Sequence, residues 1–180
     1  IDCSTDSPGY DYFAAARTLM ESGHNLRHEL LRQNLESLPP EEYDDMALNA
    51  ARSLAEESDL AVDWLRLGQI LLAREAWNDA IIIFSRVVNA KKSTNFEVAE
   101  AFFFRSNAYY FSGQIHESIQ DSTSFIKLPD ISINNIADVL NNRSIAYSKI
   151  GETEKAINDS TRVINLPNVS VQQIARALTA

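Results

Sequence analysis

A shift of 38 residues lays the later part of the chain onto itself, and this internal repeat limits what the chain can fold into. Alanines recur in one register at positions 61, 99, 137 and 175. The same shift aligns a series of identical residues: Arg105-Ser106 with Arg143-Ser144, Ala108-Tyr109 with Ala146-Tyr147, Gly113 with Gly151, and Asp121-Ser122-Thr123 with Asp159-Ser160-Thr161. A unit of this size cannot bury its apolar face alone, so the repeat predicts a stack in which each unit covers the next.

Each unit has the sequence pattern of two helices. The first is expected over about residues 96–111, where apolar residues recur at helical spacing, and Gly113 is a typical residue after a helix end. The second is expected over about residues 115–127, ahead of Pro129. Candidate N-caps of the first helices stand 38 residues apart, at Thr94, Ser132 and Ser170. No strand pattern of comparable strength occurs, so the sequence predicts an all-α fold of stacked antiparallel helical hairpins with about nine to ten helices.

The repeats also carry residues at the signature positions of a known family. These are Trp64, Leu67-Gly68, Leu71, Trp77, Ala80 and Phe84, then Ala99-Glu100-Ala101-Phe102, Asn107-Ala108-Tyr109-Tyr110 and Gly113, then Leu140, Ala146-Tyr147, Gly151 and Ala156-Ile157. With them, residues 61–180 resemble the tetratricopeptide repeat (TPR) family. The resemblance implies a right-handed superhelix of hairpins, an α-solenoid. The period is about four residues longer than the family's usual 34, so one extra turn is expected in the first helix or its entry loop.

The repeat register divides the chain. The repeats are expected over residues 61–98, 99–136 and 137–174, with the start of a further helix at 175–180. Residues 1–60 are expected to form an acidic helical region with helices over about 8–22, 24–37 and 41–57. Three helices allow two phasings, in which either the first two or the last two form a degenerate repeat. The second phasing keeps the helix types alternating into residue 61, so we favour it, with the first helix as a cap.

The charge of the chain is unevenly distributed. Residues 61–180 carry as many acids as bases, so the whole net charge of −9 belongs to residues 1–60. Binding of nucleic acid is not expected, because it needs clustered basic side chains. Membrane insertion is not expected either, since no run of about 18 apolar residues occurs. No secretion signal is visible, and Cys3 is the only cysteine, so a cytoplasmic, intracellular location without disulfides is expected.

Two positions change together between the repeats. Arg105 and Arg143 stand where the family usually has Leu, and an acid follows each of them sixteen residues later, Asp121 and Asp159. The first repeat has Leu67 and Ile83 at the same two positions. These positions should face each other in a helical hairpin, which predicts Arg105–Asp121 and Arg143–Asp159 ion pairs. The alternative is that all four are solvated surface charges.

No catalytic set is visible in the sequence. His24 and His28 could touch one metal ion but are too few ligands for a zinc site, and the acids after residue 40 lack the spacing of a calcium loop. No phosphate-binding loop or nucleophile motif occurs. The chain is therefore expected to be no enzyme and to need no cofactor or metal.

The resemblance to TPR proteins implies that the first helix of each repeat lines a concave groove, which binds a peptide or a partner helix. By position, the groove residues are Val62, Leu65, Gln69, Leu72, Glu100, Phe103, Asn107, Tyr110, Phe111, Asp138, Asn141, Ile145, Ser148, Lys149 and Arg176. Phe103 and Tyr110 are the expected anchors, because exposed aromatic side chains dominate interface energies. The alternative for Phe103 is packing against a neighbouring repeat.

Two further readings stay open. Some TPR proteins hold a C-terminal carboxylate of a chaperone with Lys, Asn and Arg side chains. Asn107, Asn142 and Arg176 stand at or near such positions, whereas Phe103 and Ala180 replace two of the basic residues, so the match is partial. The other reading is an oligomerisation or regulatory segment, and in both readings the chain is expected to be a fragment of a larger protein. The apolar face of the last helix, at Ile174, Ala175 and Leu178, would then be covered either by further repeats or by another copy of the chain.

Overall fold

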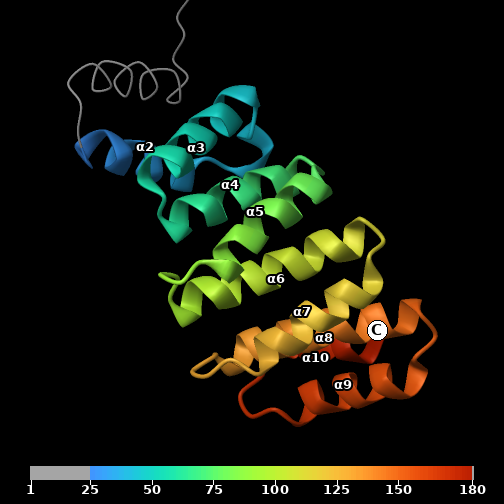
Figure 1. Cartoon of the computed structure of the whole chain (residues 1–180). Helices are drawn as coiled ribbons and strands as arrows, with labels where there is room; N and C mark the ends of the chain where they lie inside the picture. Colours follow the sequence, from blue (N-terminus) through green and yellow to red (C-terminus); the bar gives the residue numbers. More distant parts are fainter. Residues whose placement is uncertain (1–24, 180) are drawn as a thin grey trace, which may run out of the picture.

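The computed structural model describes residues 25–179. The expected capping helix over 8–22, His24 and Ala180 lie outside the described residues. Nine α-helices and one 3-10 helix, with no strand, make up residues 25–179: α2 (Asn25–Ser37), η1 (Pro40–Glu42), α3 (Asp45–Ser58), α4 (Ala61–Ala73), α5 (Trp77–Asn89), α6 (Asn95–Phe111), α7 (Ile115–Ile126), α8 (Ile133–Lys149), α9 (Thr153–Asn165) and α10 (Val171–Thr179). Figure 1 shows them stacked from α2 and α3 at one end to α8, α9 and α10 at the other.

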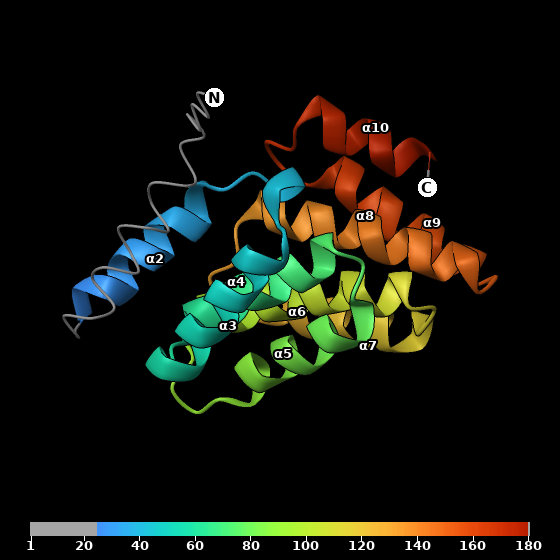
Figure 2. The same cartoon turned by 90° about the horizontal axis from the view of Figure 1, so that it is seen from above.

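Consecutive helices pack as pairs, and each pair covers the next one. The helices α4 and α5, α6 and α7, and α8 and α9 form the hairpins. The first helix of each hairpin also packs against its counterpart in the neighbouring hairpin, so α4 contacts α6, α6 contacts α8, and α8 contacts α10. Figure 2 gives the same stack in a second view. The predicted all-α fold, an α-solenoid of stacked hairpins, is confirmed.

The extra turn of the long repeat lies in the first helix. Helices α6 and α8 have 17 residues each, whereas α4 has 13. Ala61 opens α4, but the matching Ala99 and Ala137 lie one turn inside their helices. A capping box between Thr94 and Glu97 starts α6, and the Ser132 side chain accepts a hydrogen bond from a backbone N–H at the start of α8. The longer helices extend the surface that the first helices present.

The helix predicted over 41–57 begins later than expected. The acidic run enters a short 3-10 turn, and α3 starts at Asp45 because the Asp44 side chain caps it, 2.8 Å from the backbone nitrogen of Ala47. Helix α3 packs against both α2 and α4. The interpretation of α2 and α3 as a degenerate repeat ahead of residue 61 stays a prediction.

The tight turn within each hairpin needs a left-handed residue. Gly113 and Gly151 adopt positive φ angles of 84° and 78°, and no neighbouring atom lies within 4 Å of an added Cβ. Glu75 takes the same place in the first hairpin with φ of 61°. Glycine adopts this conformation without steric cost, so the two glycines recur for a backbone reason, and Glu75 is the strained member of the series.

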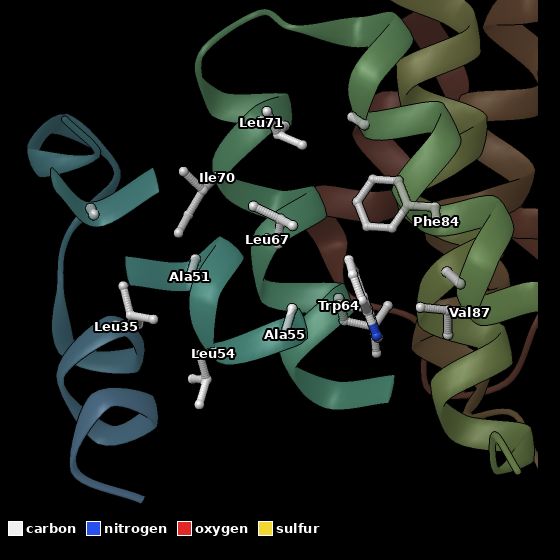
Figure 3. Packing of buried hydrophobic residues seen from close by; sticks show 14 of the residues in the cluster. Leu35, Ala51, Leu54, Ala55, Trp64, Leu67, Ile70, Leu71, Phe84 and Val87 are labelled. Atoms are coloured by element: carbon white, nitrogen blue, oxygen red, sulfur yellow. The ribbon is translucent and has the colours of Figure 1, made fainter. Parts of the chain in front are cut away.

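The largest apolar cluster joins α2 to α6. Figure 3 shows Trp64, Leu67, Phe84 and Val87 meeting between α4 and α5. Gly68 lies directly against the Phe84 ring, and a Cβ added at this glycine would overlap the ring. The glycine therefore permits the close approach of α4 and α5 around a fully buried aromatic side chain.

Both predicted ion pairs are present. Arg105 Nε and Nη2 donate to the two Asp121 carboxylate oxygens at 2.7 and 2.8 Å, and Arg143 contacts Asp159 at the same distances. The Arg143 and Asp159 side chains are 10% and 2% exposed, so these are not solvated surface charges. Burial raises the pKa of the Asp121 carboxyl, and the hydrogen bonds from Arg105 oppose that rise.

Each arginine also reaches the preceding repeat. Arg105 Nη1 donates to Ser85 Oγ at 2.8 Å, and Arg143 Nη1 donates to Thr123 Oγ1 at 2.8 Å. In the first hairpin, Leu67 and Ile83 instead belong to the large apolar cluster. The same polar link therefore joins the second hairpin to the first and the third to the second, whereas the facing positions inside the first hairpin are apolar.

Candidate functional site

Three of the cavities formed by residues 25–179 lie along the first helices of the repeats. The α2/α4 cavity, about 250 Å³, is lined by Arg32, Leu35, Glu36, Leu54, Val62, Asp63, Leu65, Arg66, Gln69 and Glu100. The aromatic cavity, about 420 Å³, is lined by Phe96, Ala99, Glu100, Phe103, Phe104, Phe125, Asp130, Ile131, Ser132, Asn135 and Asp138. The amide cavity, about 250 Å³, is lined by Asn107, Tyr110, Phe111, Ser118, Asn142, Ile145 and Arg176.

One face of α6 connects the three cavities. Glu100, Phe103, Asn107 and Tyr110 follow one another at spacings of three or four residues, which places them in a row along a helix. Glu100 lines both the α2/α4 cavity and the aromatic cavity, and Tyr110 lines the amide cavity. The row covers about 15 Å of helix at 1.5 Å per residue.

A chain of side-chain hydrogen bonds crosses the amide cavity. Asn142 Nδ2 donates to Asn107 Oδ1 at 3.1 Å, and Arg176 Nη2 donates to Asn142 Oδ1 at 2.9 Å. Arg176 Nη1 also lies 3.6 Å from Asp138 Oδ1. The three residues of the partial carboxylate-clamp match thus meet across α6, α8 and α10. An amide presents both donors and an acceptor, so these hydrogen-bonded side chains are suited to contact the backbone of an extended peptide.

Aromatic rings surround the amide cavity. Tyr110 and Phe111 meet edge to face with ring centroids 5.6 Å apart, and Phe111 stacks on Trp77 at 5.0 Å. Lys149 Nζ lies 4.7 Å from the Tyr110 ring centroid. The rim is therefore basic, with Lys149 and Arg176, and its aromatic side chains remain accessible.

Phenylalanines form the floor of the aromatic cavity. Phe103 meets Phe104 edge to face at 5.3 Å and lies 6.4 Å from Phe125 of α7. Phe103 is half-buried, so it packs within its own repeat and still lines the cavity. These aromatic contacts of Phe103 lie within its own repeat rather than with a neighbouring one, and its expected role as an anchor stays a prediction.

The rim of the aromatic cavity is acidic. Burial raises the pKa of the Glu100 carboxyl, nearby Glu97 adds to the rise, and Arg66 opposes it. Asp130 is exposed in the loop before α8, and Asp138 is shared with Arg176. Among the described residues that line this cavity, none is Lys, Arg or His.

The structure brings most of the predicted groove residues into cavities and removes two from the surface. Asn107, Tyr110, Phe111, Ile145 and Arg176 line the amide cavity, and Lys149 lies over Tyr110. Gln69 lines the α2/α4 cavity, and Leu72 is half-buried against the core.

Leu65 and Asn141 were predicted to lie on the groove surface, but both side chains are buried. Leu65 is 3% exposed and belongs to the apolar core, at the floor of the α2/α4 cavity. Asn141 is fully buried, because α10 packs over it and the Gln173 carbonyl accepts a hydrogen bond from its Nδ2 at 3.1 Å. The position of a residue along a first helix does not tell whether it faces the groove or is buried between helices, because the next first helix can cover the same face.

The ion pair between Arg32 and the buried Asp63 was missed from the sequence. Arg32 Nε and Nη2 donate to the two oxygens of Asp63, each at 2.8 Å, and the Ser58 hydroxyl also donates to this carboxylate. Asp63 is 1% exposed, so α2 is attached to α4 through a buried charge. The sequence did contain a sign of this pair, because an acid stands within the mostly apolar segment 61–72 and would need a partner when buried.

The described residues give no sign of a metal site or a membrane span. Among residues 25–179, no three His, Cys, Asp or Glu side chains are grouped so that they could hold a metal ion. Within the same range, no helix has the length and apolar character needed to cross a bilayer.

The comparisons with known proteins give a fold. No family model matches the chain, and no curated protein matches it. The solved structure "MamA 41-end from Desulfovibrio magneticus RS-1" is similar, with a TM-score of 0.59 and 15% identity over 96% of this chain and 97% of that one. The "MamA RS-1 ArsTM double mutant" is similar at a TM-score of 0.58 and 14% identity, over 87% of this chain and 92% of that one. At these identities the likeness shows that the chain shares the helical-repeat fold.

Proposed function

We propose that the chain is a protein-interaction scaffold, rather than an enzyme, and that it binds an extended peptide along α6 and α8. The observation that carries the proposal is the pair of cavities along α6, one with an aromatic floor and one crossed by hydrogen-bonding amides. Ligand sites commonly combine an apolar surface with a few convergent polar groups.

The dimensions support a single peptide in both cavities. Phe103 and Tyr110 are seven residues apart on α6, which is about 10 Å along the helix. An extended peptide covers this distance with about three residues. The half-buried Phe103 and Tyr110 rings support a role as anchors, since they need little further ordering on binding.

Selection from a phage-displayed library of random dodecapeptides tests the proposal. We expect the whole chain to enrich a peptide family, and we expect a Phe103→Ala/Tyr110→Ala variant to lose capture of it. Ile82→Ala, which removes an exposed apolar side chain from α5, is the matched control and should retain capture. Equal capture by all three proteins, each shown to be folded by circular dichroism, contradicts the groove assignment.

Self-association is the second candidate, and α10 supports it. Val171 and Leu178 are 84% and 70% exposed on this helix. Light scattering gives the mass in solution. A dimer that Leu178→Glu converts to monomer would favour self-association, whereas a monomer at all concentrations would contradict it.

A further inference from the structure

We propose that the aromatic cavity receives a lysine or arginine side chain of the bound peptide; this rests on the peptide-binding function proposed above and names the ligand chemistry of one part of the groove. The cavity lies between the amino-terminal halves of α6 and α8 and is bordered by the loop ahead of α8.

The lining matches the two parts of a long cationic side chain. Four phenylalanines, Phe96, Phe103, Phe104 and Phe125, offer an apolar surface to an aliphatic stem. Three carboxylates, those of Glu100, Asp130 and Asp138, stand around them for the charged end. A cation above an aromatic ring gains from the ring quadrupole as well as from nearby carboxylates.

The balance of charge around the cavity favours a cation. The positive charge of Arg66, on α4, attracts the Glu100 carboxylate, and Arg176 lies 3.6 Å from Asp138. The negative charges of these two carboxylates are therefore partly neutralised. Glu97 adds a further negative charge beside Glu100. Within the described residues, Glu100 and Asp130 form no ion pair, which leaves an acidic excess for a ligand to neutralise.

The carboxylates are dispersed rather than convergent. They do not form a group that could hold a metal ion, as judged over residues 25–179. A metal needs several oxygens around one point, whereas an extended side chain with a mobile ammonium or a broad guanidinium is suited to spaced acids. The cavity therefore favours an organic cation.

The neighbouring amide cavity has the opposite charge. Its rim carries Arg176 and Lys149. A peptide that spans both cavities would place a basic residue in the aromatic cavity and direct its other end toward a basic rim. This contrast predicts an orientation along α6 as well as a composition.

The peptide selection described above tests this proposal with one more variant. Glu100→Gln/Asp130→Asn removes two charges with little change of shape, and asparagine tolerates the positive φ of 59° at position 130. We expect peptides selected on the unaltered chain to carry Lys or Arg at a constant position, and the variant to bind them about three- to tenfold more weakly at low salt. Asp79→Asn/Glu154→Gln, two exposed acids on second helices, is the charge-matched control and should leave affinity unchanged.

A small probe gives an independent measurement. Nuclear magnetic resonance titration with Nα-acetyl-lysine methylamide should shift backbone amides of residues 96–104 and 130–138 saturably. The uncharged Nα-acetyl-norleucine methylamide should bind more weakly to the same residues. Equal shifts with both probes, or the same lysine affinity in Glu100→Gln/Asp130→Asn, would overturn the proposal.

The two proposals fail in different ways. If no selected peptide depends on Phe103 and Tyr110, the peptide-binding function fails. If such peptides are obtained but carry no constant basic residue, or if Glu100→Gln/Asp130→Asn binds them unchanged, the cation site alone fails.

Discussion

Arg143 lies in a two-bond contact with Asp159, its Nε 2.7 Å and its Nη2 2.8 Å from the two carboxylate oxygens, and the same arrangement recurs between Arg105 and Asp121. A planar guanidinium matches a carboxylate in this geometry, so each pair holds the two helices of its hairpin in a defined register. The third hydrogen bond, from Arg143 to Thr123, fixes the hairpin to the one before it.

Removing one partner of this pair should be costly. Arg143→Met removes the two-bond partner of Asp159, which is 2% exposed and keeps only Arg162, 3.5 Å away, as a cation. We expect the free energy of unfolding to fall by about 3 kcal/mol, the lower end for a broken buried ion pair. Arg143→Leu/Asp159→Ile, which copies the first repeat, should cost clearly less than the single change. Urea denaturation measures both, and Arg52→Met, at an exposed arginine on α3, is the control. A double variant as unstable as the single one would contradict the argument.

Gly68→Ala should destabilise the first hairpin. The new methyl group would overlap the Phe84 ring, and an overpacked core typically loses about 1–3 kcal/mol. Phe84→Leu on the same background makes room, so the double variant should be less destabilised than the two separate losses added together. Thermal unfolding of the four proteins measures this coupling. If the stability losses of the two single variants simply add in the double variant, the Phe84 ring can move away from the new methyl group.

Glu100→Gln should stabilise the chain near neutral pH. Burial and Glu97 raise the pKa of this carboxyl above its ordinary value of 4.5, although Arg66 opposes the rise. The folded state therefore holds the proton more tightly than the unfolded state, and stability falls as pH increases from 4.5 through the raised pKa. The stability of the Gln variant should not fall with pH in this way, because glutamine does not ionise. Urea denaturation should show the variant's advantage at pH 7 and a smaller one at pH 4; an equal difference at both values would contradict it.

Arg32→Ala should release α2 from the stack. The change leaves Asp63 buried without its cation, although Ser58 still donates to it. We expect the α2 amides to exchange faster in Arg32→Ala than in the unaltered chain, because α2 lies at one end of the described array. The α8 amides should exchange at the same rate in both proteins. Arg52→Ala, an exposed arginine on α3, is the control and should leave exchange unchanged. Equal protection of α2 in Arg32→Ala would show that apolar packing of Leu31 and Leu35 suffices.

Several structural features could be predicted because they repeat. The change from Leu67 and Ile83 to arginine and aspartate identified the facing positions, since a buried charge constrains its partner to change with it. Gly113 and Gly151 marked the hairpin turns because the backbone there needs a positive φ. The Arg32–Asp63 pair occurs once, so no second copy drew notice to it.

The amino-acid sequence by itself determined the local and periodic features of this protein: the helices, their caps and turns, and the faces along which hairpins stack. These depend on residues at short, regular separations. Only the tertiary structure decided which first-helix positions stay accessible, because that depends on what the next helix covers. Asn141 and Asn142 are adjacent on α8, yet α10 buries the first and leaves the second to bridge Asn107 and Arg176. The cavities likewise arise between helices, where the volumes of side chains distant in sequence leave space unfilled.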